Sequence, residues 1–179
     1  MPGFQIRPLA PDDFDWVRRV VVTEWSAEMV IAHNEVFHPT DLPGFVAFAG
    51  EEPVGLLTNN LAGDEFEIVT LDLLSTERGV GTALIEAARQ AAGRAGCTQL
   101  FLVTTNNNTH ALRYFQKRGF LIAVVRLKAL EKSRHLKPEI PLADKDGPSI
   151  RDEIELEINL EKLPSPPFFF FFLEYLKYE

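Results

Sequence analysis

Two closely spaced glycines, Gly79 and Gly81, stand where strand-forming residues give way to a helical pattern, within the segment from Leu71 to Leu84. At such a junction several main-chain N–H groups lack acceptors inside the helix, and the peptide dipoles add partial positive charge. Glycine matters because a Cβ would obstruct the approach of phosphate oxygens to the backbone. The segment therefore predicts a loop that binds a diphosphate.

The glycine pair alone is not specific, because such pairs also occur at ordinary turns and helix starts. A Rossmann fingerprint would require glycine or alanine at the place of Leu84 and an acid at the end of the next strand, where Thr104 and Thr105 stand. A Walker A loop would require Gly-Lys-Ser/Thr, which is absent. The segment fits neither of these nucleotide-binding motifs.

A second segment, from Asn108 to Phe120, combines a polar helix cap, an apolar helix face and the terminating Gly119. It is similar to motif B of the GCN5-related N-acetyltransferase (GNAT) superfamily, N-x-x-A-x-x-F-Y-x-x-x-G-F. Gly79 and Gly81 match the glycines of that family's motif A, Q/R-x-x-G-x-G/A. The resemblance covers roughly residues 65 to 125, and the flanking parts resemble the family only in the order of their elements.

The resemblance implies binding of coenzyme A, with the main-chain amides from Arg78 through Thr82 around its diphosphate. Thr76 departs from the family pattern, which usually has Gln or Arg there, and Arg78 can supply part of the missing positive charge. The expected cofactor-binding residues are Leu71, Leu73, Arg78, Gly79, Val80, Gly81, Thr82, Asn108 and Phe115.

Acetylation of an amine requires a proton acceptor, because an amine with an ordinary pKa of about 10.4 is almost entirely protonated at pH 7. Glu67 resembles the residue from which many family members present this general base, often through water. The alternative is that Glu67 is a solvated or capping acid on its strand.

The family also commonly places a tyrosine hydroxyl near the sulfur of coenzyme A. Here the aligned position holds Phe115, and the tyrosine is Tyr114, which is rotated by about 100° around the helix. Two interpretations stay open: Tyr114 protonates the sulfur from a shifted helix, or the thiolate leaves without an acid while Tyr114 serves packing.

The resemblance places the first helix and the last strand beside the acceptor cleft. Glu24, Trp25, Asp152, Glu153 and Glu155 are candidates to line it, although most of these acids are expected to be solvated. Cys97 is expected to pack at the start of a strand, since no histidine partner for a nucleophile is recognisable. The four histidines, at positions 33, 38, 110 and 135, lack metal-ligand spacing and accompanying cysteines, so no metal is expected.

The expected activity is transfer of acetyl from acetyl-CoA to a primary amine of a small molecule or peptide, by direct attack in a ternary complex. A strand N–H near Leu73 is expected to polarise the thioester carbonyl. A non-catalytic acyl-CoA-binding module is the first alternative, because the motif departs at Thr76 and Tyr114. An interaction subunit is the second.

The elements that must position these residues follow one another as a mixed order of strands and helices. Strands are predicted over 4–8, 44–48, 54–60, 66–73, 98–104, 120–125 and 151–158, and helices over 14–21, 80–91, 111–115 and 129–137. The alternation of the 66–73 strand slips near Thr70, which indicates a bulge. Order and resemblance together imply an α/β (α+β) fold, a mostly antiparallel sheet of six to seven strands with helices on both faces.

Composition narrows the partners of the chain. A net charge of −8 over 179 residues argues against nucleic-acid binding, which needs surplus Lys and Arg. The single Cys97 excludes an internal disulfide, and the charged N-terminal stretch is unlike a signal peptide or membrane span. A cytoplasmic location and no membrane are expected, and a homodimer is left open.

We predict one acyltransferase domain over residues 1–162, followed by a tail over 163–179. Three prolines and five consecutive phenylalanines, Phe168 to Phe172, make this tail compositionally unusual. It is too short to span a bilayer, and a disordered or partner-packed end is the expectation.

Overall fold

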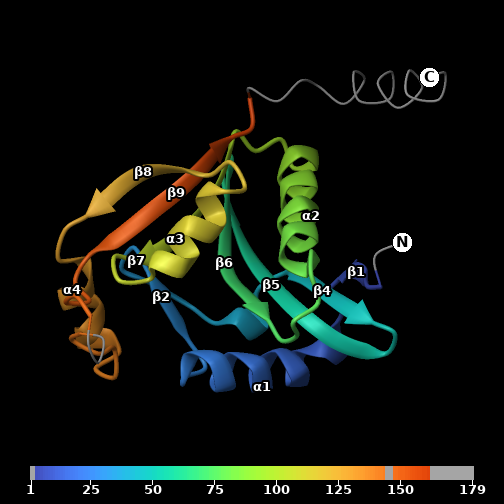
Figure 1. Cartoon of the computed structure of the whole chain (residues 1–179), viewed down its shortest axis with the longest axis horizontal. Helices are drawn as coiled ribbons and strands as arrows, with labels where there is room; N and C mark the ends of the chain where they lie inside the picture. Colours follow the sequence, from blue (N-terminus) through green and yellow to red (C-terminus); the bar gives the residue numbers. More distant parts are fainter. Residues whose placement is uncertain (1–2, 144–146, 162–179) are drawn as a thin grey trace.

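A seven-stranded sheet carries helices on both of its faces in the computed structural model, which describes residues 3–143 and 147–161 (Figure 1). The predicted tail over 163–179 lies outside the described residues. The strands are β1 (Gln5–Pro8), β2 (Val30–Ala32), β3 (Glu35–Phe37), β4 (Gly44–Ala49), β5 (Glu52–Ala62), β6 (Glu65–Leu73), β7 (Gln99–Thr105), β8 (Leu121–Arg126) and β9 (Glu153–Asn159). The α-helices are α1 (Phe14–Trp25), α2 (Val80–Arg94), α3 (Thr109–Gln116) and α4 (Ala129–Leu136).

The strand order of the large sheet is β1-β4-β5-β6-β7-β9-β8, and β2 and β3 form a separate hairpin. Every neighbouring pair in the large sheet is antiparallel except β6 and β7, which are joined through α2 and run parallel. This confirms the predicted fold class, and all seven predicted strands and four predicted helices are present among the described residues.

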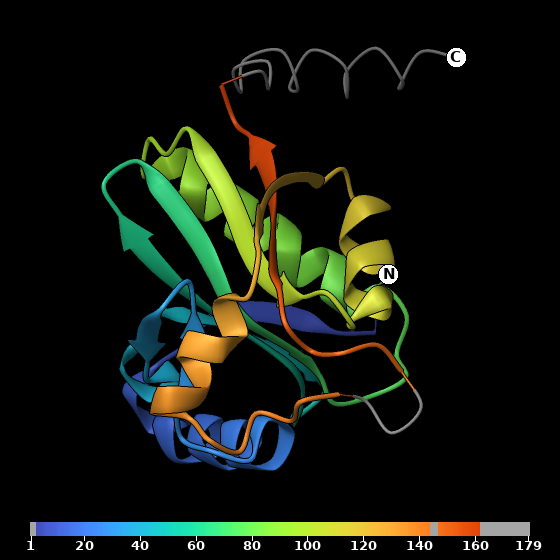
Figure 2. The same cartoon turned by 90° about the vertical axis from the view of Figure 1, so that its left-hand side faces the viewer.

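The apolar residues of each strand divide between two layers because side chains alternate across a sheet. On β5, Leu57 packs into the main core with α2 residues such as Leu84 and Ala88, whereas Leu56 packs on the other face with Val17 and Val21 of α1. Helix α4 lies on the α1 side, next to the C-terminal end of α1 (Figure 2). The α1 side is therefore one continuous face bounded by α1, α4 and the β2–β3 hairpin.

A bulge in β6 coincides with the point where β6 and β7 part. Thr70 pairs with Thr58 and Ile68 with Asn59, so Val69 is the extra residue, which confirms the irregularity predicted near Thr70. Parallel pairing joins residues 65–68 of β6 to 99–102 of β7 and stops there, although both strands continue. The sheet is consequently split beyond Ile68 and Leu102, and a split exposes backbone groups and side chains that a closed ladder would bury.

Helix α2 runs to Arg94, three residues beyond the predicted end at Ala91. Gly96 is the residue with left-handed backbone (φ 75°), and Cys97 N–H donates to the carbonyl of Ala92 (3.0 Å). This capping arrangement requires glycine at one position only, and that position is Gly96 rather than Gly93. Within the described ranges, no helix has the length and apolar character of a membrane span.

Candidate functional site

The start of α2 is built as the sequence predicts for an anion-binding loop. Gly79 precedes the helix with a left-handed backbone (φ 92°), and the first bond of the helix runs from the Ala83 N–H to the Gly79 carbonyl (2.9 Å). The amides of Val80, Gly81 and Thr82 come before that bond, and amides of a first turn have no acceptor within the helix. Arg78 is exposed immediately before them, so this end of α2 carries both partial and formal positive charge.

Gly81 is buried beneath α3, and a side chain there would collide. An ideal Cβ on Gly81 would meet the hydroxyl of Tyr114 and would lie 3.1 Å from Leu73 Cδ1. Glycine is therefore required at this position by packing against two neighbouring side chains, a constraint that the motif alone does not reveal.

Tyr114 is held in this place by Arg118. The Arg118 guanidinium lies 3.4 Å from the centre of the Tyr114 ring, and its Nη1 donates to the Tyr114 carbonyl (2.8 Å). Arg118 Nε also donates to Thr82 Oγ1 (3.1 Å), which ties α3 directly to the first turn of α2. Burial raises the pKa of Tyr114. The roles assigned to Tyr114 and to the loop residues stay predictions.

The other two predicted residues of α3 have different surroundings. Asn108 caps the helix, its side chain accepting the Ala111 N–H (3.1 Å), and it also lines a pocket at the split of the sheet. Phe115 is 8% exposed and packs edge to face against Phe120 in the main core. Phe115 therefore has little surface available for contact with a cofactor.

A pocket of about 130 Å³ opens where β6 and β7 separate, on the α1 side of the sheet. Two carboxylates line the pocket, Glu67 on β6 and Glu153 on β9, and β7 lies between these two strands in the sheet. The pocket is also lined by Trp25 of α1, Leu130 of α4 and Asn108. The split thus brings acids from both halves of the chain to one small cavity.

Glu67 is hydrogen-bonded to His33, a residue that the sequence did not indicate as part of the site. His33 lies in the two-residue turn between β2 and β3, and its Nε2 is 3.0 Å from Glu67 Oε1. This hydrogen bond raises the pKa of His33. Because Glu67 is 3% exposed, the alternative of a solvated acid is wrong. Its role as general base stays a prediction.

Glu153 is held by the same turn. Its Oε2 accepts the backbone N–H of His33 (3.1 Å), and burial raises the pKa of Glu153. The expectation that most candidate acids are solvated is wrong for Asp152, Glu153 and Glu155, which are all buried. The reason lies in their partners: Asp152 is bound by Arg151 (2.8 Å) and Glu155 by Arg126 (2.6 Å).

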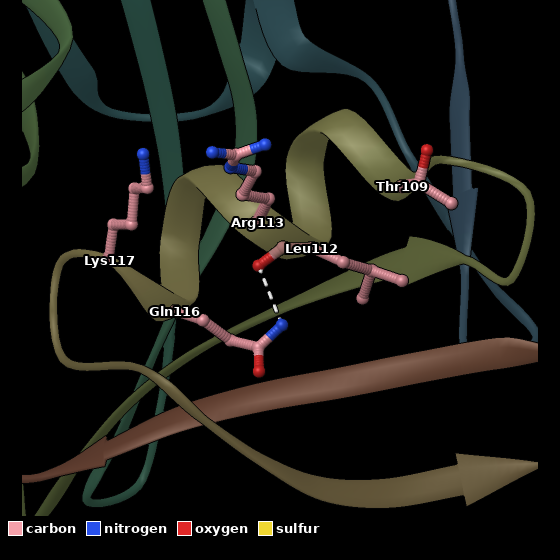
Figure 3. A pocket seen from close by; sticks show the side chains of 5 residues that line it. All are labelled: Thr109, Leu112, Arg113, Gln116 and Lys117. Atoms are coloured by element: carbon pink, nitrogen blue, oxygen red, sulfur yellow. Dashed lines mark hydrogen bonds between the residues drawn. The ribbon is translucent and has the colours of Figure 1, made fainter.

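Larger hollows lie outside this split, and two of them border elements of the candidate site. One, of about 430 Å³, lies on the other side of Glu67 and is bordered by His33, Arg126 and Glu155. The other, of about 450 Å³, lies along α3 and is lined by that helix alone; Arg113 and Lys117 extend to one side of it and Gln116 to the other (Figure 3). The α3 hollow contains none of the predicted site residues, so the split is the better candidate despite its smaller volume.

Asp72 is a buried acid on β6 that lies outside the pocket wall. Its Oδ1 accepts from Trp25 Nε1 (3.1 Å), its Oδ2 is buried without a partner among the described residues, and burial raises its pKa from 3.8 to about 6. Asp72 thus supports Trp25, which lines the pocket, at the cost of a buried charge.

We expect replacement of Asp72 by asparagine to change the pH dependence of stability. An acid whose pKa is higher in the folded state makes the protein less stable as pH rises from about 4 to about 6. A rise in pKa from 3.8 to about 6 corresponds to about 3 kcal/mol of unfolding free energy. Relative to the wild type, Asp72→Asn should therefore gain about 1 kcal/mol or more between pH 5 and pH 7.5. Urea unfolding at both pH values measures this, and an equal difference at both would contradict the raised pKa.

Comparison with known proteins places these features in a family. Residues 8–120 match the family model described as the acetyltransferase (GNAT) family. The uncharacterized protein YdhI of Bacillus subtilis (strain 168) is 38% identical over 131 residues, which are 73% of this chain and 82% of YdhI.

No group of three or more His, Cys, Asp or Glu suited to a metal ion occurs in the described ranges 3–143 and 147–161.

Solved structures share the fold at low identity. An IAA acetyltransferase from Bacillus cereus ATCC 14579 superimposes with a TM-score of 0.67 at 20% identity, over 87% of this chain and 99% of that one. A GNAT family acetyltransferase from Elizabethkingia anophelis with acetyl-CoA bound gives a TM-score of 0.62 at 18% identity, over 89% and 99%. These similarities concern the fold.

Proposed function

Because the chain belongs to the acetyltransferase (GNAT) family, we propose that it transfers the acetyl group of acetyl-CoA to a primary amine. The observation that carries the proposal is the split between β6 and β7, with Glu67 in its wall and the glycine-bearing start of α2 directly after β6. The amides of Val80, Gly81 and Thr82 precede the first bond of the helix, as expected of a loop that binds a diphosphate.

The chemistry requires one proton acceptor and one activated acyl group. Acetyl-CoA supplies the thioester. The neutral amine nitrogen forms a bond to its carbonyl carbon, and the carbon–sulfur bond breaks to release the thiolate, which becomes the thiol by taking up the proton that the nitrogen loses on acylation. Glu67 takes the proton from the amine, and its hydrogen bond with His33 fixes the carboxylate while leaving a path toward the larger hollow beyond it. Catalysis otherwise rests on positioning, as expected for direct attack in a ternary complex.

Release of free thiol from acetyl-CoA, measured over a panel of primary amines, tests this proposal. The panel includes small alkylamines, diamines, amino acid amides and peptides with free N-termini, since the acceptor class is open. Calorimetry with CoA gives the matching binding measurement. Thiol release that depends on one class of amine is the expected result, and absence of heat with both CoA and acetyl-CoA would overturn the proposal.

A non-catalytic acyl-CoA-binding module is the second candidate, favoured by one observation. The position that usually holds the tyrosine of this family is Phe115, which has no hydroxyl and is buried. CoA binding without thiol release for any amine in the panel would support this candidate instead.

Tyr114→Phe distinguishes the two interpretations of the tyrosine. The contact between its hydroxyl and Gly81 favours a role in shaping the loop, so we expect the KM for acetyl-CoA to rise severalfold with little change in kcat. Steady-state kinetics with varied acetyl-CoA measures both constants. A tenfold or greater fall in kcat at unchanged KM would instead support Tyr114 as the proton donor to the sulfur.

A further inference from the structure

Glu153 has a carboxylate oxygen for which the described protein supplies no hydrogen bond. The residue is 1% exposed at the start of β9, and its Oε2 is satisfied by the His33 backbone N–H (3.1 Å). Its Oε1 is buried without a partner among residues 3–143 and 147–161. Buried carboxylate oxygens are nearly always bonded, so an oxygen left open in a pocket wall indicates a donor that enters the pocket.

The nearby cations make their side-chain hydrogen bonds to other acids, and Arg126 Nη1 is buried without a partner among the described residues. Arg126 forms an ion pair with Glu155 (2.6 Å), and the imidazole of His33 is bonded to Glu67 (3.0 Å). Arg126 pairs with Glu153 across the sheet and, like His33, favours its charged form, but among the described residues Glu153 accepts a hydrogen bond only from the backbone amide of His33. Glu153 Oε1 therefore keeps a position for a hydrogen-bonding cation, and a buried carboxylate gains most from a partner in direct contact.

We propose that Glu153 Oε1 binds the protonated amino group of the acceptor in the pocket between β6 and β7. This inference rests on the proposed function and assigns its acceptor class: an unhindered primary amine that enters as the ammonium ion. The pocket of about 130 Å³ has room for an ammonium group and a short carbon stem rather than for a branched or bulky amine. Glu153 thereby selects and positions the amine, and Glu67, on β6 at the other side of the split, removes its proton.

The distribution of partners explains why two acids are needed. Glu67 already shares its Oε1 with His33, which orients it as a proton acceptor, whereas Glu153 Oε1 has no partner among the described residues. Burial also raises the pKa of Glu153, although the charges of Arg126 and His33 act in the opposite direction. An incoming ammonium group would donate the hydrogen bond that Oε1 lacks.

Ethylammonium chloride is a suitable probe because it is small enough for the pocket and does not presuppose the natural acceptor. The full chain, labelled with ¹⁵N, is titrated at pH 7 and constant ionic strength, and the His33 amide is observed because it donates directly to Glu153. We expect a saturable shift of that amide in the wild type, at least tenfold weaker binding in Glu153→Gln, and no such shift with ethanol. Glutamine keeps one acceptor oxygen for the His33 N–H, replaces the other oxygen by an NH2 donor and removes the charge.

The matched control is Glu157→Gln, on the same strand and the same face, where the carboxylate is already bonded to Gln99 (2.5 Å). It should bind ethylammonium like the wild type. Equal binding by the wild type and Glu153→Gln, or no saturable shift at His33, would overturn the inference. CoA added to the same samples tests the proposed function separately, through the amides of residues 79–82: a CoA response without an ethylammonium response removes the Glu153 inference alone.

Discussion

Gly81→Glu is expected to abolish the binding of CoA, with Kd raised at least about 100-fold, which corresponds to about 2.7 kcal/mol. A Cβ at this position meets the Tyr114 hydroxyl and presses on Leu73, so the Tyr114 side chain must shift from its place beside the first turn of α2. The added carboxylate also places negative charge at a helix N-terminus that is proposed to hold a diphosphate. Steric and electrostatic effects therefore act in the same direction, and calorimetry with CoA measures their sum.

Gly93→Glu is the matched control for this experiment. It makes the same substitution on the same helix, but a Cβ at Gly93 meets no atom within 4 Å. Its CoA affinity should equal that of the wild type. Gly81→Ala separates the two effects, since it introduces the collision without the charge and should weaken binding less. If Gly81→Glu shows a wild-type circular dichroism spectrum and binds CoA normally, the loop is not the diphosphate site.

The parts of the fold that could be predicted are those whose signals are local. The motif around Gly79 and Gly81, the cap at Asn108 and the alternation in β5 and β6 each depend on residues a few positions apart. The bulge at Val69 also left a trace, because a bulge interrupts the alternation of the strand that contains it. Short-range periodicity was enough to place the loop, the central strand and the helices around the split.

The acidic pocket could not be predicted in the same way, because its members meet only after folding. His33 is 34 residues from Glu67 and 120 residues from Glu153 along the chain, yet it is bonded to both. The hairpin that carries His33 escaped prediction since its strands have only three residues each. One local signal was present, the residue pair His33-Asn34. Both residues adopt positive φ in the two-residue turn, and His and Asn are enriched in that conformation.

Glu67→Gln is expected to lower kcat by a factor of about 10² to 10⁴ at pH 7, the usual contribution of a general base. The glutamine retains the shape of the side chain but cannot accept a proton. The loss should shrink as pH rises. Below the pKa of the amine, an increase of one pH unit raises the neutral fraction of the amine about tenfold. Rates of thiol release from pH 6 to pH 9, with the most active amine of the panel, measure both the loss and its slope.

A second measurement checks that Glu67→Gln has its intended local effect. The hydrogen bond to the Glu67 carboxylate raises the pKa of His33 by favouring the charged imidazolium, so the neutral glutamine should lower the pKa of His33 toward its ordinary value. NMR titration of the imidazole reports this without any turnover.

Glu65→Gln, an exposed acid two residues earlier on β6, is the control and should leave both kcat and the pKa of His33 unchanged. A variant in which the pKa of His33 falls while kcat and its pH profile stay those of the wild type would show that the pair exists but does not carry the proton. The proton would then have to pass to another group in the pocket wall, and Glu153 is the remaining carboxylate there.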